Sequence, residues 1–213
     1  MTMDFNALSE AIIKGNMDAA MQETQKALDS GGVPQAILDQ GLIAAMDIVG
    51  QKFSLGTMFV PQMLRSAKTM QSCVALLKPQ FQAGTISSKG TVAMGTVKAD
   101  LHDIGKNLVA MMLEGAGFTI IDLGVDVSPE AFVQVVSEKS PQIIGISALL
   151  STTMPSMTAT IQALIRAGLR DKVKVMIGGA PVTAKFADEI GADRYAPDAG
   201  SAVASAKELV PSA

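Results

Sequence analysis

Cysteine and histidine are each represented by a single residue in this chain of 213 residues. A disulfide needs two thiols and a cysteine-based metal cluster needs several, so Cys73 excludes both within one chain. We interpret Cys73 as a small apolar group buried on a helix. The other scarce residue, His102, is the only imidazole available for metal ligation or proton transfer.

Aromatic residues and an excess of basic charge are also missing. Aromatic residues make up 4% of the chain, and 17 basic groups face 20 acidic ones for a net charge of −3. This composition lacks both the positive surface and the stacking platform that nucleic acids require. We therefore expect no nucleic-acid partner.

Long hydrophobic runs are absent as well. The longest apolar stretches, such as residues 143–150, contain Gly or Ser and fall short of the roughly 20 residues that a membrane-spanning helix needs. The N-terminus has neither the basic region nor the apolar core of a secretory signal. We expect no membrane partner and a cytoplasmic location.

The N-terminal part of the sequence has a helical pattern. From residue 5 to about 82, apolar residues recur at spacings of three and four, with short interruptions at 14–16, 30–32 and 54–57. Pro34 and Pro61 lie where helices can begin, because a first-turn proline loses no intrahelical hydrogen bond. The pattern predicts four helices in a bundle of about 80 residues.

The periodicity changes after this bundle. Small polar residues predominate around 83–90, which predicts a helical domain at 1–84, a linker at 85–90 and a second domain at 91–213. In the second domain, short β-rich runs alternate with helical patterns, as in a parallel sheet covered on both faces. The runs are 91–97, 119–122, 143–146, 173–177 and, more weakly, 193–195. We predict a flavodoxin-like, doubly wound sheet of five strands, with its ligand site beyond the carboxyl ends of the strands.

The single histidine follows the first predicted strand. Asp100 lies two residues before His102, so in an extended loop its carboxylate can bind one ring nitrogen and leave the other free for a metal. The alternative is a surface histidine that happens to have acidic neighbours. The Asp-x-His spacing alone does not separate the two.

Other strand ends carry residues that suit a binding slot. The third strand leads into Ser147, Ser151, Thr152 and Thr153, and the fourth into Gly178-Gly179, where missing side chains leave room for a ligand to approach the backbone. Gly105 has the same property. Each feature also has a plain explanation, as a turn or a helix cap. Together they outline a deep slot with the histidine at its mouth.

The combination resembles the cobalamin-binding domains. The signature consists of Asp-x-His-x-x-Gly at 100–105, Ser-x-Leu at 147–149 and Gly-Gly at 178–179, in this order and each at a strand end. The run from Asp100 to Asn107 is similar to that of cobalamin-dependent methionine synthase and of the small corrinoid proteins of methyltransferase systems. The segment 56–67 resembles the helical cap of the same family, so the resemblance covers nearly the whole chain.

The resemblance implies a role for each matching residue. His102 would replace the cofactor's own benzimidazole as the lower ligand of cobalt, Asp100 would tune it, and the hydroxyl of Thr153 or of Ser151 would bind Asp100. Ser147, Leu149, Gly178, Gly179 and Ala199 would line the slot for the displaced nucleotide tail. Phe59, Met63 and Leu64 are candidates for cap contacts with the cofactor, or for plain bundle core. The full set of implied cofactor contacts is Ala99, Asp100, Leu101, His102, Asp103, Ile104, Gly105, Ser147, Leu149, Ser151, Thr153, Gly178, Gly179, Ala199, Phe59 and Met63.

The resemblance also implies a function. The chain has no room for a substrate-activating barrel of roughly 250 residues, so we expect a non-autonomous corrinoid subunit that carries a methyl group on cobalt. A substrate-specific methyltransferase would load the group, forming methylcobalamin. A second methyltransferase would pass it to tetrahydrofolate or coenzyme M, and a reductive activase is a further expected partner.

Two other functions fit the same cofactor. A cobalamin-binding sensor would read the state of the cofactor, but is usually joined to a DNA-binding or signalling module that we do not find. A radical mutase subunit would carry the histidine motif without needing a helical cap of this kind. The methyl donor could be a methylamine, methanol, a betaine or an aryl methyl ether.

Overall fold

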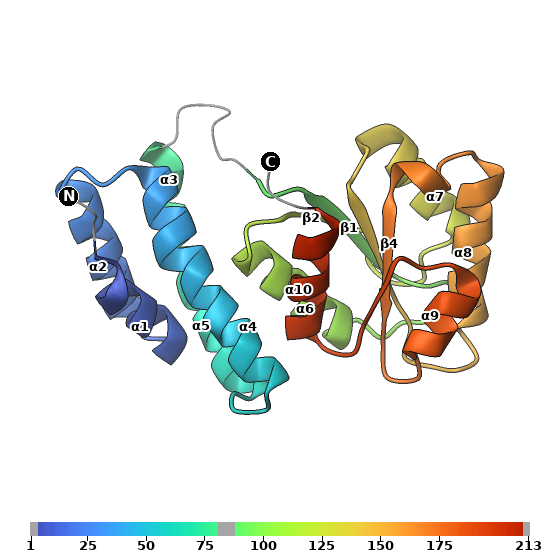
Figure 1. The fold of residues 1–213 in the computed structure, drawn as a ribbon, viewed down its shortest axis with the longest axis horizontal. Coiled ribbons are helices and arrows are strands. Elements are labelled where there is room, and N and C mark those ends of the chain that lie inside the picture. The colour runs from blue at the N-terminus through green and yellow to red at the C-terminus, as the bar shows by residue number, and fades with distance from the viewer. Residues whose placement is uncertain (1–3, 81–87, 211–213) are drawn as a thin grey trace. The chain divides into compact units, whose positions relative to one another are not determined.

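The computed structural model describes residues 4–80 and 88–210 (Figure 1). The chain divides into two compact units, one formed by the residues up to 88 together with 115–117, and the other by 89–114 together with the residues from 118 onward. Residues 85–87 of the linker predicted at 85–90 lie outside the described residues. Each unit is described by itself below.

The N-terminal unit is entirely helical in its described part. Its elements are α1 (Asn6–Lys14), α2 (Met17–Asp29), α3 (Pro34–Ala36), the π-helical segment η1 (Ile37–Ile43), α4 (Ala44–Ser54), α5 (Val60–Leu77) and the 3-10 turn η2 (Lys78–Gln80). Because α3, η1 and α4 follow one another without a break, they form one continuous helix. The four predicted helices are therefore confirmed.

Local chemistry explains where these helices begin and end. Asn16 caps α2 by accepting a hydrogen bond from the amide of Ala19 at 3.2 Å. The amide of Phe59 donates to the side chain of Gln62 at 3.0 Å at the start of α5. The hydroxyl of Ser66 donates to the carbonyl of Ile13 at 3.1 Å and so ties α5 to α1.

The C-terminal unit contains a parallel sheet of five strands in the order β2-β1-β3-β4-β5. The strands are β1 (Thr91–Thr96), β2 (Thr119–Asp122), β3 (Ile143–Ser147), β4 (Lys174–Gly178) and β5 (Arg194–Ala196). This order is that of flavodoxin-like sheets, so the predicted fold class is confirmed. The register pairs Thr96 with Ser147 and Ser147 with Gly178. The carboxyl ends of the three central strands therefore lie side by side.

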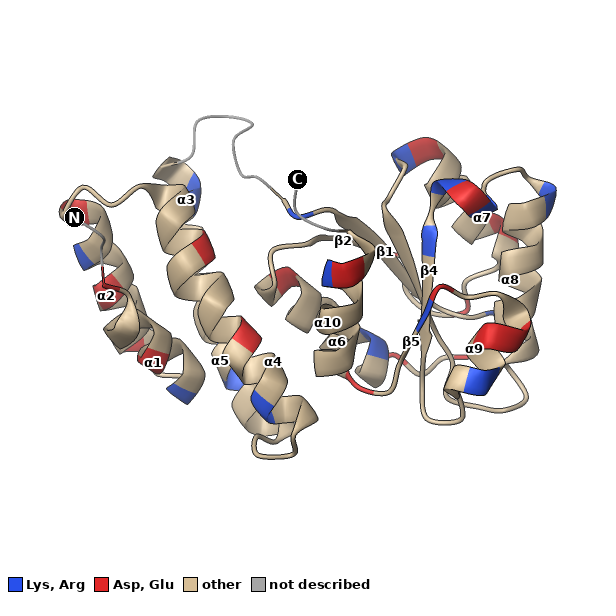
Figure 2. Ribbon diagram, viewed as in Figure 1, with Lys and Arg blue, Asp and Glu red and all other residues tan. Residues whose placement is uncertain are grey.

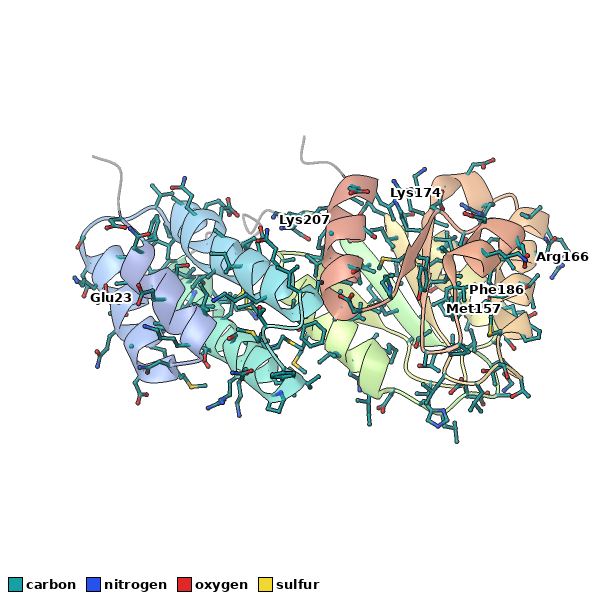
Figure 3. The ribbon with its side chains drawn as sticks, turned by 60° about the horizontal axis from the view of Figure 1, so that its bottom comes forward. Glu23, Met157, Arg166, Lys174, Phe186 and Lys207 are labelled. Carbon is teal, nitrogen blue, oxygen red and sulfur yellow. The ribbon has the colours of Figure 1, made fainter. Side chains whose placement is uncertain are left out.

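Helices cover both faces of this sheet (Figure 1). They are α6 (Ile104–Gly115), α7 (Pro129–Lys139), α8 (Pro155–Arg166), α9 (Ala184–Ile190) and α10 (Ala199–Leu209), with a 3-10 turn η3 at Arg170–Lys172. The helices α7, α8 and α9 pack on one face and share its apolar core, whereas α6 and α10 lie on the other. Met157 of α8 is buried in that core and Phe186 of α9 packs against it (Figure 3). The central strands are buried on both faces, as in other doubly wound sheets.

Charged residues of both signs are interspersed along the helices of each unit (Figure 2). Within 4–80 and 88–210, no helix is long and apolar enough to cross a membrane.

Candidate functional site

The candidate site lies at the carboxyl edge of the sheet, where the loops after β1 and β3 meet. The amide of Val97 donates to the carbonyl of Ser147 at 2.9 Å, which extends the pairing of the two strands by one step. Beyond this point the chain carries His102 in one loop and Thr153 in the other. The topology thus joins two segments that are about fifty residues apart in the sequence.

Asp100 is the buried centre of the site, with no exposed surface. Its Oδ1 accepts hydrogen bonds from the amide of His102 at 3.1 Å and from the ring Nδ1 of His102 at 2.7 Å. Its Oδ2 accepts from the amide of Leu149 and the hydroxyl of Thr153, both at 2.8 Å, and has a longer contact of 3.4 Å with the amide of Leu150. The carboxylate is therefore surrounded by donors from both loops.

These donors decide the charge of Asp100. Burial by itself raises the pKa of the Asp100 carboxyl, because a charge is poorly solvated inside a protein. The hydrogen bonds from the Leu149 amide, the His102 ring, the Thr153 hydroxyl and the His102 amide act in the opposite direction and together lower the pKa well below its usual range. Asp100 is thus ionised at neutral pH, with its charge stabilised by the protein.

The ionised carboxylate fixes the orientation of His102. An ionised carboxylate can only accept, so the ring nitrogen Nδ1 at 2.7 Å must carry the hydrogen and donate it. In the neutral ring the lone pair then lies on Nε2. The His102 side chain is 50% exposed, so the ring is held at the surface by one nitrogen while the other is available to a ligand. This is the arrangement of a metal-binding histidine with a carboxylate behind it.

The hydroxyl that reaches Asp100 belongs to Thr153 rather than to Ser151. Thr153 is buried, whereas Ser151 is exposed. The Thr153 Oγ1 lies 2.8 Å from Asp100 Oδ2 and 2.8 Å from the carbonyl oxygen of Leu150. A hydroxyl has one hydrogen, and the ionised carboxylate is the stronger of the two acceptors, so Thr153 donates its hydrogen to Asp100.

Further contacts hold the backbone of the histidine loop. The buried Thr96 donates its hydroxyl to the carbonyl of His102 at 2.9 Å. From the loop after β2, Asp126 accepts the amide hydrogen of Ala99 at 2.8 Å. Sequence reasoning missed both residues. A hydroxyl at a strand end and an acid in the next loop carried no signal before the topology was known.

The surroundings of His102 suit a large, partly apolar ligand. Leu101 and Ile104 flank the histidine in the sequence and are 71% and 83% exposed, and Leu149 and Leu150 on the facing loop are also exposed. Such exposure of neighbouring large apolar side chains is typical of a binding surface. At Gly105 an added Cβ would meet no atom within 4 Å, so the start of α6 is open on that side. These residues fit a flat macrocycle with a bound metal.

Close backbone packing within the protein accounts for Gly178 and Gly179, whereas the sequence suggested room for a ligand. A Cβ on Gly178 would come within 2.8 Å of the carbonyl oxygen of Ala196, and one on Gly179 would overlap the carbonyl oxygen of Ala148. Gly179 also has a φ of 129°, which other residues rarely adopt. The structure therefore needs these glycines for its own backbone packing, and their contact with a ligand stays a prediction.

The remaining predicted residues lie in different environments. Ser147 ends β3 and is half-buried, and Ala199 is buried at the start of α10. Asp103 is exposed and accepts a hydrogen bond from the side chain of Asn107 at 3.0 Å in the first turn of α6. In the helical unit, Phe59 is 68% exposed and Leu64 is partly exposed, whereas Met63 is buried. Phe59 is thus the more accessible of the two cap residues predicted to contact the cofactor.

Known proteins share this architecture along nearly their whole length. Residues 90–204 and 4–78 each match a B12 binding domain. The chain is 45% identical over 204 residues to dimethylamine corrinoid protein 1 of Methanosarcina mazei, covering 95% of this chain and 94% of that protein. It is 42% identical over 200 residues to the trimethylamine corrinoid protein of Methanosarcina barkeri, covering 93% and 92%.

Solved structures agree. The methanol:cobalamin methyltransferase complex MtaBC of Methanosarcina barkeri contains a chain with a TM-score of 0.85 and 28% identity, covering 98% of this chain and 80% of that one. A cobalamin-binding protein of Desulfitobacterium hafniense has a TM-score of 0.82 and 32% identity, covering 98% and 100%.

The chain therefore belongs to the B12-binding domain proteins. Within them it belongs to the corrinoid proteins of methyltransferase systems, so the family resemblance seen in the sequence is confirmed. The corrinoid cofactor predicted from it is confirmed as well.

Proposed function

We propose that this chain carries a methyl group on the cobalt of a corrinoid, with His102 as the lower ligand of the metal. The observation that supports this proposal is the half-exposed imidazole, whose Nδ1 is bound to the buried Asp100 and whose Nε2 has no hydrogen bond to any residue within 4–80 and 88–210. When bound, the corrinoid supplies a cobalt atom that can accept and release a methyl group. Every other step below concerns the residues of the chain.

In this function the residues of the chain hold the Nδ1 proton and the imidazole ring of His102 in place. Asp100 keeps the proton on Nδ1 of His102 and strengthens the electron donation from Nε2, because a hydrogen bond to a carboxylate adds electron density to the imidazole. Thr153 and the amide of Leu149 hold the opposite carboxylate oxygen. A proton gained by this network weakens the donation from Nε2, and a proton lost strengthens it. The network can thus adjust how strongly Nε2 of His102 donates electrons to the metal.

The partners follow from the class of protein. A methyltransferase loads the methyl group, and a second one removes it and passes it to tetrahydrofolate or coenzyme M; a reductive activase restores inactive cofactor. Similarity to dimethylamine and trimethylamine corrinoid proteins supports a methylamine as the methyl donor. Exposed Phe59 is the cap residue best suited to touch the cofactor.

The first experiment measures retention of cobalamin. The purified full chain and His102→Ala are incubated with a cobalamin, freed of excess cofactor and compared by visible absorption. We expect near-stoichiometric retention by the wild type and an altered spectrum in the variant. A wild-type chain that retains no cobalamin would disprove the proposal.

A second experiment separates a carrier from a sensor. The chain loaded with methylcobalamin is mixed with candidate methyltransferases, and methyl transfer to tetrahydrofolate or coenzyme M is followed with a labelled methyl group. A carrier loses its label at a rate that depends on the partner's concentration. A chain that binds the cofactor but exchanges no methyl with any candidate partner would point to sensing.

A further inference from the structure

The loops after β1 and β2 are joined by reciprocal hydrogen bonds. The amide of Ala99 donates to Oδ1 of Asp126 at 2.8 Å, and the amide of Asp126 donates to the carbonyl of Asp100 at 3.0 Å. A bridge between Val97 and Val127 closes the same contact. We call the pair of hydrogen bonds between Asp126 and residues 99–100 the Asp126 clasp. It includes the backbone carbonyl of Asp100, the residue whose side chain holds His102.

The clasp holds an unfavourable backbone conformation. Ala99 has a φ of 67°, in the left-handed region where Cβ crowds the backbone. For a residue other than glycine this conformation is unfavourable. The hydrogen bond from the Ala99 amide to the Asp126 carboxylate offsets part of that cost. Without the carboxylate of Asp126, Ala99 would favour a different conformation.

A change at Ala99 would be felt at the imidazole. The backbone of Ala99 sets the direction in which Asp100 leaves the chain, and Asp100 Oδ1 contacts the ring nitrogen of His102 at 2.7 Å. Catalytic and ligating side chains must be held within about 0.5 Å of their working positions. A rotation of the backbone two or three residues before the ligand exceeds that tolerance.

The second oxygen of Asp126 has a lesser role. Its Oδ2 pairs with Nζ of Lys98 at 2.9 Å, and the two side chains are 42% and 55% exposed. An exposed ion pair of this kind contributes little to stability, because water and salt screen it. The working atom of Asp126 is therefore the oxygen that accepts the amide hydrogen of Ala99, and not the charge that faces Lys98.

We propose that Asp126 is a positioning residue that sets the orientation of His102 through the backbone of Ala99 and Asp100. The inference rests on the proposed function, since it concerns the same ligand. Asp126 itself has a φ of 54°, so the loop after β2 also adopts an unusual conformation where it meets Ala99. Both residues joined by the Ala99–Asp126 hydrogen bond thus have a positive φ.

Three variants of the full chain test the proposal. Asp126→Ala removes the acceptor. Asp126→Asn keeps an amide oxygen that can accept the Ala99 hydrogen, and Lys98→Met removes only the ion pair. We expect Asp126→Ala to bind cobalamin at least about tenfold more weakly than the wild type, and Asp126→Asn and Lys98→Met to stay within about threefold. Asp126→Gly, which accommodates the positive φ, replaces Asp126→Ala if the alanine variant does not fold.

Spectroscopy reports on the imidazole directly. In the reduced Co(II) state, electron paramagnetic resonance shows the nitrogen coupling of a bound imidazole, and we expect Asp126→Ala to lose part of this coupling. Because His102 is the only histidine, the apoprotein gives a single set of imidazole signals in nuclear magnetic resonance. The Nδ1 proton of this ring should exchange faster in Asp126→Ala than in the wild type.

The outcomes separate this proposal from the proposed function. If the wild type shows no retained cobalamin or no nitrogen coupling, the proposed function fails, and the apoprotein signals still test the clasp. If Asp126→Ala leaves affinity, coupling and proton exchange unchanged, the clasp proposal alone is wrong. It is also wrong if Lys98→Met, or Asp126→Asn, does as much damage as Asp126→Ala.

Discussion

At the scale of single residues, the site consists of a buried hydrogen-bond acceptor, Asp100, and a half-exposed metal-ligand candidate, His102. Asp100 is ionised although it has no exposed surface, since backbone amides, a hydroxyl and the ring of His102 all donate to it. His102 places only one nitrogen in this network. The charge of the site is thus inside the protein, and its reactive atom is at the surface.

Replacement of Thr153 tests the inner part of this network. Thr153→Val removes the hydroxyl that donates to the buried carboxylate, and we expect the free energy of unfolding to fall by about 1.5–3 kcal/mol, as for other hydrogen bonds to charged groups. Thr153→Ser keeps the donor and should lose less. Urea unfolding of the apoprotein measures the difference. Ser151→Ala is the matched control, and an equal loss in that variant would contradict the assignment.

Gly105 lies in open space and Gly179 is crowded, so substitution by alanine should change the stability of the protein in opposite directions at the two positions. Gly105→Ala should raise the stability of the apoprotein by about 0.4–1 kcal/mol, because it stiffens the unfolded chain and its Cβ meets nothing. The same methyl group should weaken cobalamin binding, which needs the open side of α6. Gly179→Ala should prevent folding or cost more than about 4 kcal/mol, because its Cβ overlaps the carbonyl oxygen of Ala148.

Thermal unfolding and cobalamin titration of the two glycine variants check this prediction. A stable Gly179→Ala protein would show that the loop after β4 can relax. A Gly105→Ala protein that binds cobalamin as tightly as the wild type would show that the start of α6 does not face the cofactor.

The sequence was informative about residues whose partners are close in the chain. Asp100 and His102 are two residues apart, and their contact follows from that spacing. The contribution of Asp126 depends on the packing of the loop after β2 against the loop after β1, so no local pattern signals it. For Gly179 the sequence showed the glycine but not its crowding by Ala148 on another strand end, and its contact with a ligand stays a prediction.

At the scale of elements, an ion pair between a buried lysine and a half-exposed aspartate joins α6 to β2. Lys106 lies in the first turn of α6 with its side chain almost wholly buried, and its Nζ is 2.6 Å from Oδ1 of Asp122, which ends β2. The same oxygen accepts the amide hydrogen of Gly124 at 2.9 Å. The pair therefore fixes the helix that follows the histidine loop to the strand that leads into the Asp126 loop.

This ion pair predicts a dependence of stability on pH. Burial raises the pKa of Asp122. The hydrogen bonds from Lys106 and Gly124 and the charge of Lys106 lower it by more than burial raises it, so the pKa is below its usual value. A lowered pKa means that the unfolded chain binds more protons, so the stabilisation is present above about pH 4 and is lost as the pH falls. Asp122→Asn should cost about 1–3 kcal/mol at pH 7, since it leaves the Lys106 ammonium buried without its charged partner.

Urea unfolding of the wild type and of Asp122→Asn at pH 7 and at pH 3 measures this effect. The gap between the two proteins should shrink at the lower pH. The double variant Lys106→Met/Asp122→Asn is the control, because it removes both members and should recover most of the loss. A gap that stays constant between the two pH values would exclude the ion pair as its cause.

Elements were predictable where periodicity was strong. The strands begin and end within about two residues of the predicted runs, because buried parallel strands need short apolar segments between helices. The π-helical segment between α3 and α4 was not predicted. A helix that changes its hydrogen bonding in the middle keeps a similar apolar pattern. The segment packs closely on α1, since a Cβ on Gly41 would come within 2.9 Å of the Leu8 side chain.

At the scale of the whole molecule, the candidate site belongs to one of the two units. Apart from the cap candidates, every residue predicted to contact the cofactor lies between Ala99 and Ala199, and the apolar core beneath α7, α8 and α9 is formed by the same unit. The helical unit has its own helix contacts, such as that between Ser66 and Ile13. We therefore expect the C-terminal unit to bind the cofactor without the helical unit.

A fragment of residues 89–213 tests this separation. We expect it to unfold cooperatively and to retain cobalamin, with a spectrum that changes in His102→Ala as in the full chain. Circular dichroism and visible absorption measure the two properties. A fragment that folds but releases all cobalamin would show that the helical unit contributes essential contacts.

The hydrogen bonds around Asp100 have a consequence for how the protein is supplied with its cofactor. They all come from the chain itself, so the shape of the site does not depend on a corrinoid being present during synthesis. The loops around Asp100 lose their conformational freedom when the chain folds, so they need little rearrangement when the cofactor binds. We therefore expect the apoprotein to fold in the absence of corrinoid and to take up the cofactor later without refolding.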